Sequence, residues 1–210
     1  MEGAYTQAIQ VELVHALLER LKLDKVSVMG ISYGSEVALQ LALAYPTKVE
    51  KLILFNATAA TGPWLKDIGD AWNKASVDGE GYYLTTIPVI YSPEFYKKNK
   101  EWMDRRREIL VPVFSNPAFS GSMVRLTRSA EGYDVRDQLS KISAPTLVVS
   151  SQQDYLTPVE EQVYIAAHIP RCDHVIIPGC GHASMYEKPV LFTSVVLGFV
   201  NNSKNSYSIN

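Results

Sequence analysis

The sequence contains little cysteine, no excess of positive charge and no long hydrophobic run. Its two cysteines, Cys172 and Cys180, are too few for a disulfide framework in 210 residues or for a thiolate metal cluster. Lys and Arg number 20 against 22 Asp and Glu, so no positive field favours nucleic acid or anionic lipid as a partner. No stretch reaches the roughly 18 apolar residues of a membrane span, and residues 1–10 lack the pattern of a signal peptide. We therefore expect a cytoplasmic protein without a nucleic-acid or membrane partner.

The first 56 residues predict one strand-helix-strand unit after an amphipathic helix. A helix is expected over residues 5–21, with an apolar stripe formed by Leu13, Leu17 and Leu21 with Val14 and Leu18 beside them. A short β-branched segment at 25–30 predicts a buried strand, and helix formers follow at 35–45 until Pro46. Residues 49–56 then predict a second strand. The two strands and the helix between them are typical of a parallel sheet.

The rest of the chain divides into an insertion and a second stretch of strands and helices. Residues 57–138 are interrupted by Gly and Pro, show no strand alternation and hold all three tryptophans, which predicts a helical insertion. Beyond it, strands are predicted at 144–151 and 173–178, and helices at 159–168 and 189–200. We therefore expect an α/β fold with a doubly wound, mostly parallel sheet formed by residues 1–56 and 139–210.

Residues 30–34 read Gly-Ile-Ser-Tyr-Gly, a G-x-S-x-G pattern between a predicted strand and a predicted helix. This is the context of a nucleophile elbow, in which a strained turn presents the serine hydroxyl. Ser32 is the candidate nucleophile. The backbone N–H of Tyr33, at the start of the helix, is the candidate donor to a developing oxyanion.

A serine hydroxyl needs a histidine base and an acid that orients the histidine. Among the four histidines, His182 lies in a glycine-rich loop directly after a predicted strand, whereas His168 ends a helix and His174 opens a strand. Asp154 follows the strand at 144–151, while the equivalent place after the second strand holds Asn56, which cannot ionise. The sequence therefore predicts a catalytic triad completed by His182 and Asp154.

Other candidate features point to ordinary structural roles. Cys180 is interpreted as a packed thiol, because it has no base of its own. The basic run at 97–107 is interleaved with acidic residues, which is typical of a solvated helix face. The sequence has no HExxH metal motif and no phosphate-binding glycine loop, so we expect no metal and no cofactor.

The chain resembles the α/β-hydrolase superfamily, near its esterase, lactonase and C–C hydrolase members. The resemblance rests on GISYG, TLVVSSQQDYLTP and GCGHASMYEKPVLF, in the order Ser, Asp, His. It implies that residues 57–138 form a cap over the serine, and that the chain hydrolyses small carboxylic esters or lactones through an acyl-enzyme. The alternatives are a C–C bond hydrolase or acyltransferase on the same triad, and a catalytically silent or ligand-binding chain.

The sequence departs from the family pattern in two ways. Ser35 stands where the elbow usually has a second glycine. The resemblance also implies further strands and a second oxyanion donor before Tyr5, and the sequence does not contain them. An internal strand without its neighbour exposes unpaired backbone groups, so we expect weak esterase activity and either poor solubility or a homo-oligomer joined at the Val26–Met29 edge.

Overall fold

The computed structural model describes residues 5–202, which form a four-stranded parallel sheet in the order β1-β2-β3-β4. The strands are β1 (Val26–Ile31), β2 (Val49–Phe55), β3 (Thr146–Ser151) and β4 (Cys172–Ile177). Every neighbouring pair is parallel, so the carboxyl ends of all four strands lie at the same edge of the sheet. The predicted α/β class and parallel sheet are confirmed, with strand ends displaced by one or two residues.

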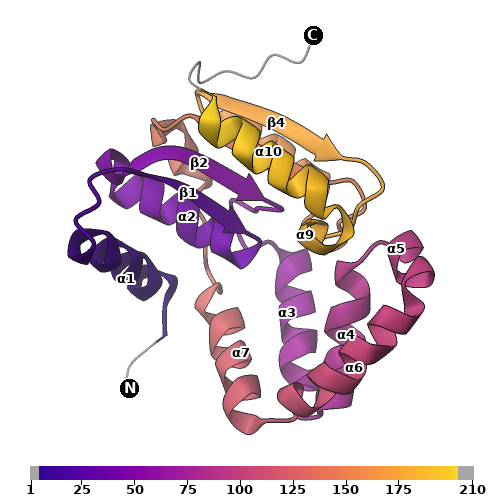
Figure 1. The fold of residues 1–210 in the computed structure, drawn as a ribbon. Coiled ribbons are helices and arrows are strands. Elements are labelled where there is room, and N and C mark those ends of the chain that lie inside the picture. The colour runs from indigo at the N-terminus through magenta and orange to yellow at the C-terminus, as the bar shows by residue number, and fades with distance from the viewer. Residues whose placement is uncertain (1–4, 203–210) are drawn as a thin grey trace.

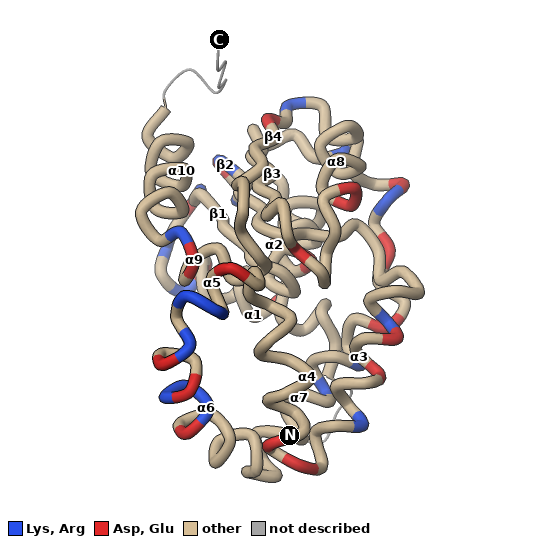
Figure 2. Tube along the Cα trace, turned by 90° about the vertical axis from the view of Figure 1, so that its right-hand side faces the viewer, with Lys and Arg blue, Asp and Glu red and all other residues tan. Residues whose placement is uncertain are grey.

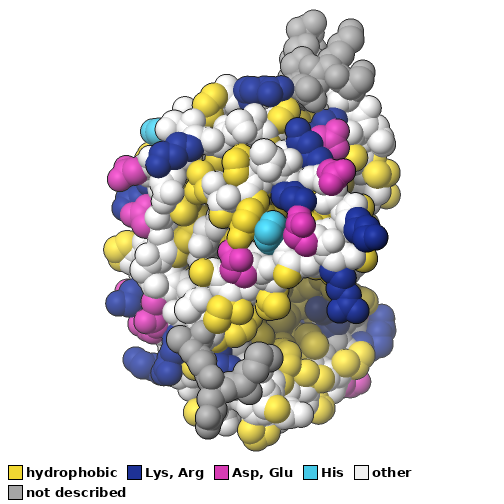
Figure 3. Space-filling model, turned by 90° about the vertical axis from the view of Figure 1, so that its left-hand side faces the viewer, with side chains coloured by type: hydrophobic (Ala, Val, Ile, Leu, Met, Phe, Trp, Pro, Cys, Tyr) yellow, Lys and Arg dark blue, Asp and Glu magenta, His cyan; other side chains and the backbone are white. Residues whose placement is uncertain are grey.

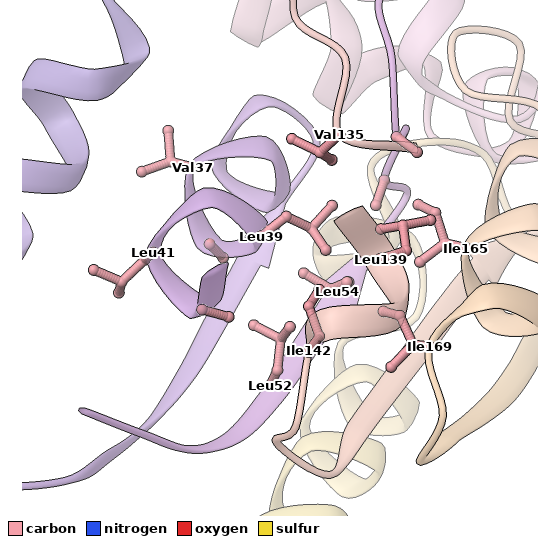
Figure 4. Close-up of a cluster of buried hydrophobic side chains, with 14 of the residues drawn as sticks. Val37, Leu39, Leu41, Leu52, Leu54, Val135, Leu139, Ile142, Ile165 and Ile169 are labelled. Atoms are coloured by element: carbon pink, nitrogen blue, oxygen red, sulfur yellow. The ribbon is translucent and has the colours of Figure 1, made fainter. Parts of the chain in front are cut away.

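Helices cover both faces of the sheet (Figure 1). One face carries α1 (Gln7–Arg20), α2 (Tyr33–Ala44), α8 (Val159–His168) and the 3₁₀ helix η2 (Arg136–Lys141), and the other carries α10 (Pro189–Asn201). Two short helices, η1 (Pro46–Lys48) and α9 (Ser184–Glu187), lie in connections. Figure 4 shows side chains of α2, β2, η2 and α8 meeting in the larger core cluster. The sheet is therefore the middle layer of three.

Alternation along β2 explains the two core clusters. Leu52 and Leu54 belong to the cluster under α2 and α8, whereas Ile53 and Phe55 belong to the cluster under α10. Successive side chains of a strand point to opposite faces of the sheet. A strand buried on both faces is therefore apolar at nearly every position, which is the pattern that predicted it.

The segment between β2 and β3 is helical, as expected for an insertion. It contains α3 (Pro63–Ala75), α4 (Gly79–Ile90), α5 (Pro93–Lys98), α6 (Lys100–Phe114) and α7 (Pro117–Ser129). In Figure 1 these helices form a separate group beyond the carboxyl ends of the strands. The group has its own core, in which Tyr82, Tyr83, Met103 and Phe114 are buried. Figure 2 shows charges of both signs interleaved along α6, in keeping with the predicted solvated face.

Helix α1 packs through one side of the predicted stripe only. Leu13, Leu17 and Leu21 are 64%, 52% and 56% exposed, while Val11 and Leu18 are buried. The helix has apolar residues on two sides, and the row that includes Val11 packs into the core beside α2. Periodicity identifies an apolar row but not the neighbour that covers it, so the predicted packing was wrong for Leu13, Leu17 and Leu21 and right for Val14 and Leu18.

Strand β1 lies at an edge of the sheet formed by the described residues, and Met29 on it is 44% exposed. We propose that a second copy of the chain covers this edge and the exposed α1 leucines, since unpaired strand edges and exposed apolar side chains favour association. Light scattering over a concentration series should show a dimer. Replacing Leu13 and Leu17 together by Glu should weaken dimerisation by about tenfold or more. A monomer at every concentration would contradict this expectation.

Strand β2 is also tied to the end of α10 by a buried lysine. Lys51 is 6% exposed, and its Nζ donates to the carbonyl oxygens of Phe199 (3.0 Å), Val200 (2.7 Å) and Asn202 (2.7 Å). The last carbonyls of a helix have no partner within the helix, and a cation stabilises that end. Lys51 therefore satisfies the carboxyl end of α10 from inside the fold.

Candidate active site

Ser32 occupies the sharp turn between β1 and α2, as the sequence predicted. Its backbone has φ 53° and ψ −125°, a left-handed conformation that is costly for a residue other than glycine. The turn is held by two backbone hydrogen bonds: Ser32 N donates to Phe55 O at 2.9 Å, and Ser35 N donates to Ser32 O at 2.7 Å. The strain is thus sustained by the neighbouring strand and by the first turn of α2.

The two glycines of the GISYG motif differ in the space around them for a side chain. A Cβ atom at Gly30 would lie 2.3 Å from the carbonyl oxygen of Gly34, so only glycine fits there. A Cβ atom at Gly34 would meet no heavy atom within 4 Å among the described residues. A side chain is therefore sterically excluded at Gly30 and not at Gly34.

Asp154 and His182 form a buried pair in the loops that follow β3 and β4. The Asp154 Oδ2 atom lies 2.7 Å from His182 Nδ1, and the two residues are 7% and 8% exposed. Asp154 also accepts hydrogen bonds from Leu156 N at 2.8 Å, Thr157 N at 3.0 Å and Thr157 Oγ1 at 2.8 Å. Four donors fix the carboxylate, which in turn orients the imidazole and leaves Nε2 as the nitrogen able to accept a proton.

Asn56 connects the serine turn to the histidine loop. Ser32 N bonds to Phe55 O, and the next residue, Asn56, donates from Nδ2 to the carbonyl oxygen of His182 at 2.6 Å. Asn56 is fully buried, has a φ of 50°, and its carbonyl oxygen lies 3.0 Å from Thr157 Oγ1, whose single proton it shares with Asp154. Two consecutive residues at the end of β2 therefore bond to both loops.

Asn56 and Thr157 were not identified as site residues from the sequence. Asn56 was weighed only as a position that cannot ionise. Thr157 stands three residues after Asp154, the spacing at which an aspartate accepts from a later backbone N–H in a turn. That spacing was the one available signal for Thr157, whereas the role of Asn56 depends on contacts distant in sequence.

A cavity of about 130 Å³ opens beside the serine turn. Ser32, Tyr33 and Glu36 line its core side, and α3, α4 and α7 line the rest. A cavity of about 150 Å³ with apolar walls holds a benzene molecule. Figure 3 shows a hollow with hydrophobic lining on the side of the molecule that carries α1. The apolar members of the cavity wall are Leu65, Trp72, Tyr82, Met123, Leu126 and Ala130.

Tyr33 joins the serine turn to the insertion through its side chain. Its hydroxyl lies 2.6 Å from Ser129 Oγ at the end of α7, and it accepts a hydrogen bond from the side-chain amide of Gln10 on α1. Burial raises the pKa of Tyr33 above its usual value, so the hydroxyl stays protonated. The backbone N–H of Tyr33 is the candidate oxyanion donor, and hydrogen bonds to α1 and α7 hold the side chain of the same residue in place.

Glu36 is a buried carboxyl group one helical turn after Ser32. It is 4% exposed and accepts hydrogen bonds from the side chains of Gln7 and Thr58. Burial raises its pKa from 4.5 to about 7, and these two hydrogen bonds offset part of that rise. The burial of Glu36 has no local signal in the sequence, because a glutamate in a helix is usually exposed.

We expect Glu36→Gln to change how stability depends on pH. Because the pKa of Glu36 is higher in the folded chain, its contribution is present below pH 4.5 and lost as the pH rises through 7. The wild-type chain should lose about 2 to 3 kcal/mol more than Glu36→Gln between pH 5 and pH 8. Urea unfolding of both proteins at the two pH values measures this difference. Parallel pH profiles would contradict the assignment.

The remaining candidate groups show no alternative catalytic centre. Both cysteines are free, and burial raises the pKa of each thiol to about 12, so neither is a thiolate at neutral pH. His174 contacts Ser150 Oγ at 2.7 Å, and His168 contacts the carbonyl oxygen of Tyr164 at 2.7 Å. Within residues 5–202, no group of His, Cys, Asp and Glu is arranged to hold a metal ion. No helix in that range combines the length and apolar character needed to cross a membrane.

A serine at a strained strand-to-helix turn of a parallel sheet is the arrangement found in α/β hydrolases. The sequence profile of the family described as "alpha/beta hydrolase fold" matches residues 2–189, so the chain belongs to this family. Sequence order and fold thus lead to the same class.

Individual relatives are hydrolases. The chain is 50% identical to MGS-M2, an alpha/beta hydrolase enzyme from a Medee basin deep-sea metagenome library, with a TM-score of 0.96 over 100% of this chain and 77% of that one. It is 28% identical to a pimeloyl-[acyl-carrier protein] methyl ester esterase of Nitrosomonas europaea, over 87% of this chain and 74% of the relative. It is 23% identical to a 2-hydroxymuconate semialdehyde hydrolase of Pseudomonas putida, over 95% of this chain and 70% of the relative.

Proposed function

We propose that the chain is a serine hydrolase that cleaves small carboxylic esters or lactones through an acyl-enzyme. The observation that carries this proposal is the buried Asp154–His182 pair, linked through Asn56 and Phe55 to the strained turn of Ser32. The similarity to a methyl ester esterase supports the choice of an ester. No metal or cofactor takes part in the proposed reaction.

The proposed mechanism assigns one step to each residue. Ser32 Oγ attacks the carbonyl carbon while His182 Nε2 takes its proton, and the backbone N–H of Tyr33 stabilises the oxyanion. His182 then gives the proton to the leaving oxygen, and water attacks the acyl-enzyme by the same route. Asp154 keeps the imidazole oriented and stabilises its positive charge in both halves of the reaction.

The size of the cavity favours a small acyl group. About 130 Å³ with mostly apolar walls suits a group no larger than a phenyl ring. We infer that residues 57–138 act as a cap over this acyl group, since three helices of that segment line the cavity. Long-chain esters are expected to be poor substrates.

A second candidate function is hydrolysis of a C–C bond on the same triad. It is favoured by the similarity to a 2-hydroxymuconate semialdehyde hydrolase. The two functions share Ser32 and His182 and differ in the substrate that the cavity accepts. Assaying p-nitrophenyl acetate, butyrate and benzoate beside a vinylogous 1,5-diketone separates them, because ester turnover alone supports the first proposal.

A fluorophosphonate probe tests the proposed nucleophile directly. The wild-type chain should be labelled, the site of labelling found by peptide mass spectrometry should be Ser32, and Ser32→Ala should not react. Ser35→Ala is the matched control, because Ser35 lies in the same turn and donates its hydroxyl to Phe55 O at 3.0 Å. An unlabelled but folded wild-type chain would instead support the catalytically silent alternative.

A further inference from the structure

We propose that Glu187 is a positioning residue that fixes the His182 loop against the helical insertion. This inference rests on the proposed function, because it concerns the base of the same site. Glu187 lies in α9, five residues after His182, and the proposed mechanism assigns it no step. Its partners lie on two segments far apart in sequence.

The carboxylate of Glu187 accepts three hydrogen bonds. Ser92 N donates to Oε1 at 2.6 Å, and Ser92 Oγ donates to Oε2 at 2.6 Å. Gly181 N, directly before His182, donates to Oε1 at 3.2 Å. Ser92 is 1% exposed and lies between α4 and α5 of the insertion. One carboxylate therefore bonds to both the insertion and the histidine loop.

The backbones of these two segments are in direct contact around the carboxylate. Ala183 N donates to the carbonyl oxygen of Ile90 at 2.9 Å. A Cβ atom at Gly181 would lie 2.5 Å from Ser92 N and 2.8 Å from Glu187 Oε1, so glycine is required for this approach. His182 thus lies between two residues that are each held to the segment 90–92. Movement of that segment would carry the histidine with it.

Loss of the carboxylate should displace the base more than it disturbs the substrate cavity. Neither Glu187 nor Ser92 lines the cavity beside Ser32. Without Glu187, the N–H groups of Ser92 and Gly181 lose an acceptor, and the loop relaxes towards water. A displacement of about 1 Å at a catalytic group costs up to about 100-fold in rate. The effect should therefore fall on kcat, with KM little changed.

Two substitutions of Glu187 test the role of its hydrogen bonds, since one keeps the volume of the side chain and the other removes it. Glu187→Gln keeps an oxygen for Ser92 N and Gly181 N, and its amide nitrogen can donate to Ser92 Oγ. Glu187→Ala removes every acceptor. We expect Glu187→Ala to lower kcat by about 10- to 100-fold with KM within threefold, and Glu187→Gln to restore kcat to within about threefold of wild type. Glu160→Gln, on the exposed face of α8, is the matched control.

A proton NMR measurement tests the inference independently of turnover. The downfield signal of the His182 Nδ1 proton bonded to Asp154 should be present in wild type and Glu187→Gln, and broadened or lost in Glu187→Ala. If wild type is inactive on esters yet this pattern is observed, the proposed function fails and the positioning role stands. A folded Glu187→Ala with wild-type kcat and an unchanged signal would overturn the inference. Equal loss in Glu187→Gln and Glu187→Ala would also overturn it.

Discussion

Ser32→Ala and His182→Ala are each expected to reduce kcat for a small ester by about 10⁶-fold, and the double variant should be no slower than either single one. The reason is that the hydroxyl has no nucleophilic strength without the base, and the base has no task without the hydroxyl. Steady-state kinetics on p-nitrophenyl butyrate measure the three variants against wild type.

Thermal unfolding controls for folding in this series. Ser32 has positive φ, so alanine keeps the backbone strain and removes only the hydroxyl. His182→Gln gives a second test of the base, because glutamine fills part of the imidazole volume without taking up a proton. Losses that multiply in the double variant would show that the two side chains do not act in one mechanism.

Asp154→Asn is expected to lower kcat by about 10⁴-fold. An asparagine side chain has one accepting oxygen, whereas Asp154 accepts from His182, Leu156 and Thr157 through both oxygens. The amide nitrogen of the asparagine would either face the N–H donor at His182 Nδ1 or force the imidazole into the tautomer that carries the proton on Nε2. That tautomer has no lone pair for the serine proton.

Asp137→Asn is a suitable control, because this aspartate is exposed in the first turn of η2. The rates of both variants on the same ester, measured from pH 6 to 9, show whether the loss persists when histidine is neutral. A decrease of less than about tenfold for Asp154→Asn would exclude Asp154 as the residue that orients the base.

Much of the fold was predictable because its signals are local. The apolar run of β2 and its boundaries follow from burial on both faces, and the helix α8 was predicted with the bounds that the structure has. The placement of Ser32, Asp154 and His182 after strands follows from the same reasoning, since carboxyl ends of parallel strands share one edge. The structure brings Asp154 and His182 into contact.

Other features depend on neighbours that no local pattern reveals. The stripe of Leu17 is as apolar as the row of Val11, so the sequence does not say which one α2 covers. Asn56 and Glu187 act through hydrogen bonds to residues 126 and 95 positions away. Glu36 has a helical spacing that places it near Ser32, but its burial comes from contact with α1.

The lysine under α10 sets a limit on how the carboxyl end of the chain can be shortened. Deleting residues from Phe199 onward would remove all three carbonyl oxygens that accept from Lys51, together with the Phe199 ring whose centroid lies 5.8 Å from Nζ. A hydrogen bond to a charged group contributes about 1.5 to 3 kcal/mol, so the loss of these bonds would destabilise the end of α10 and its attachment to β2. Affinity tags and fusion partners therefore belong after Asn202.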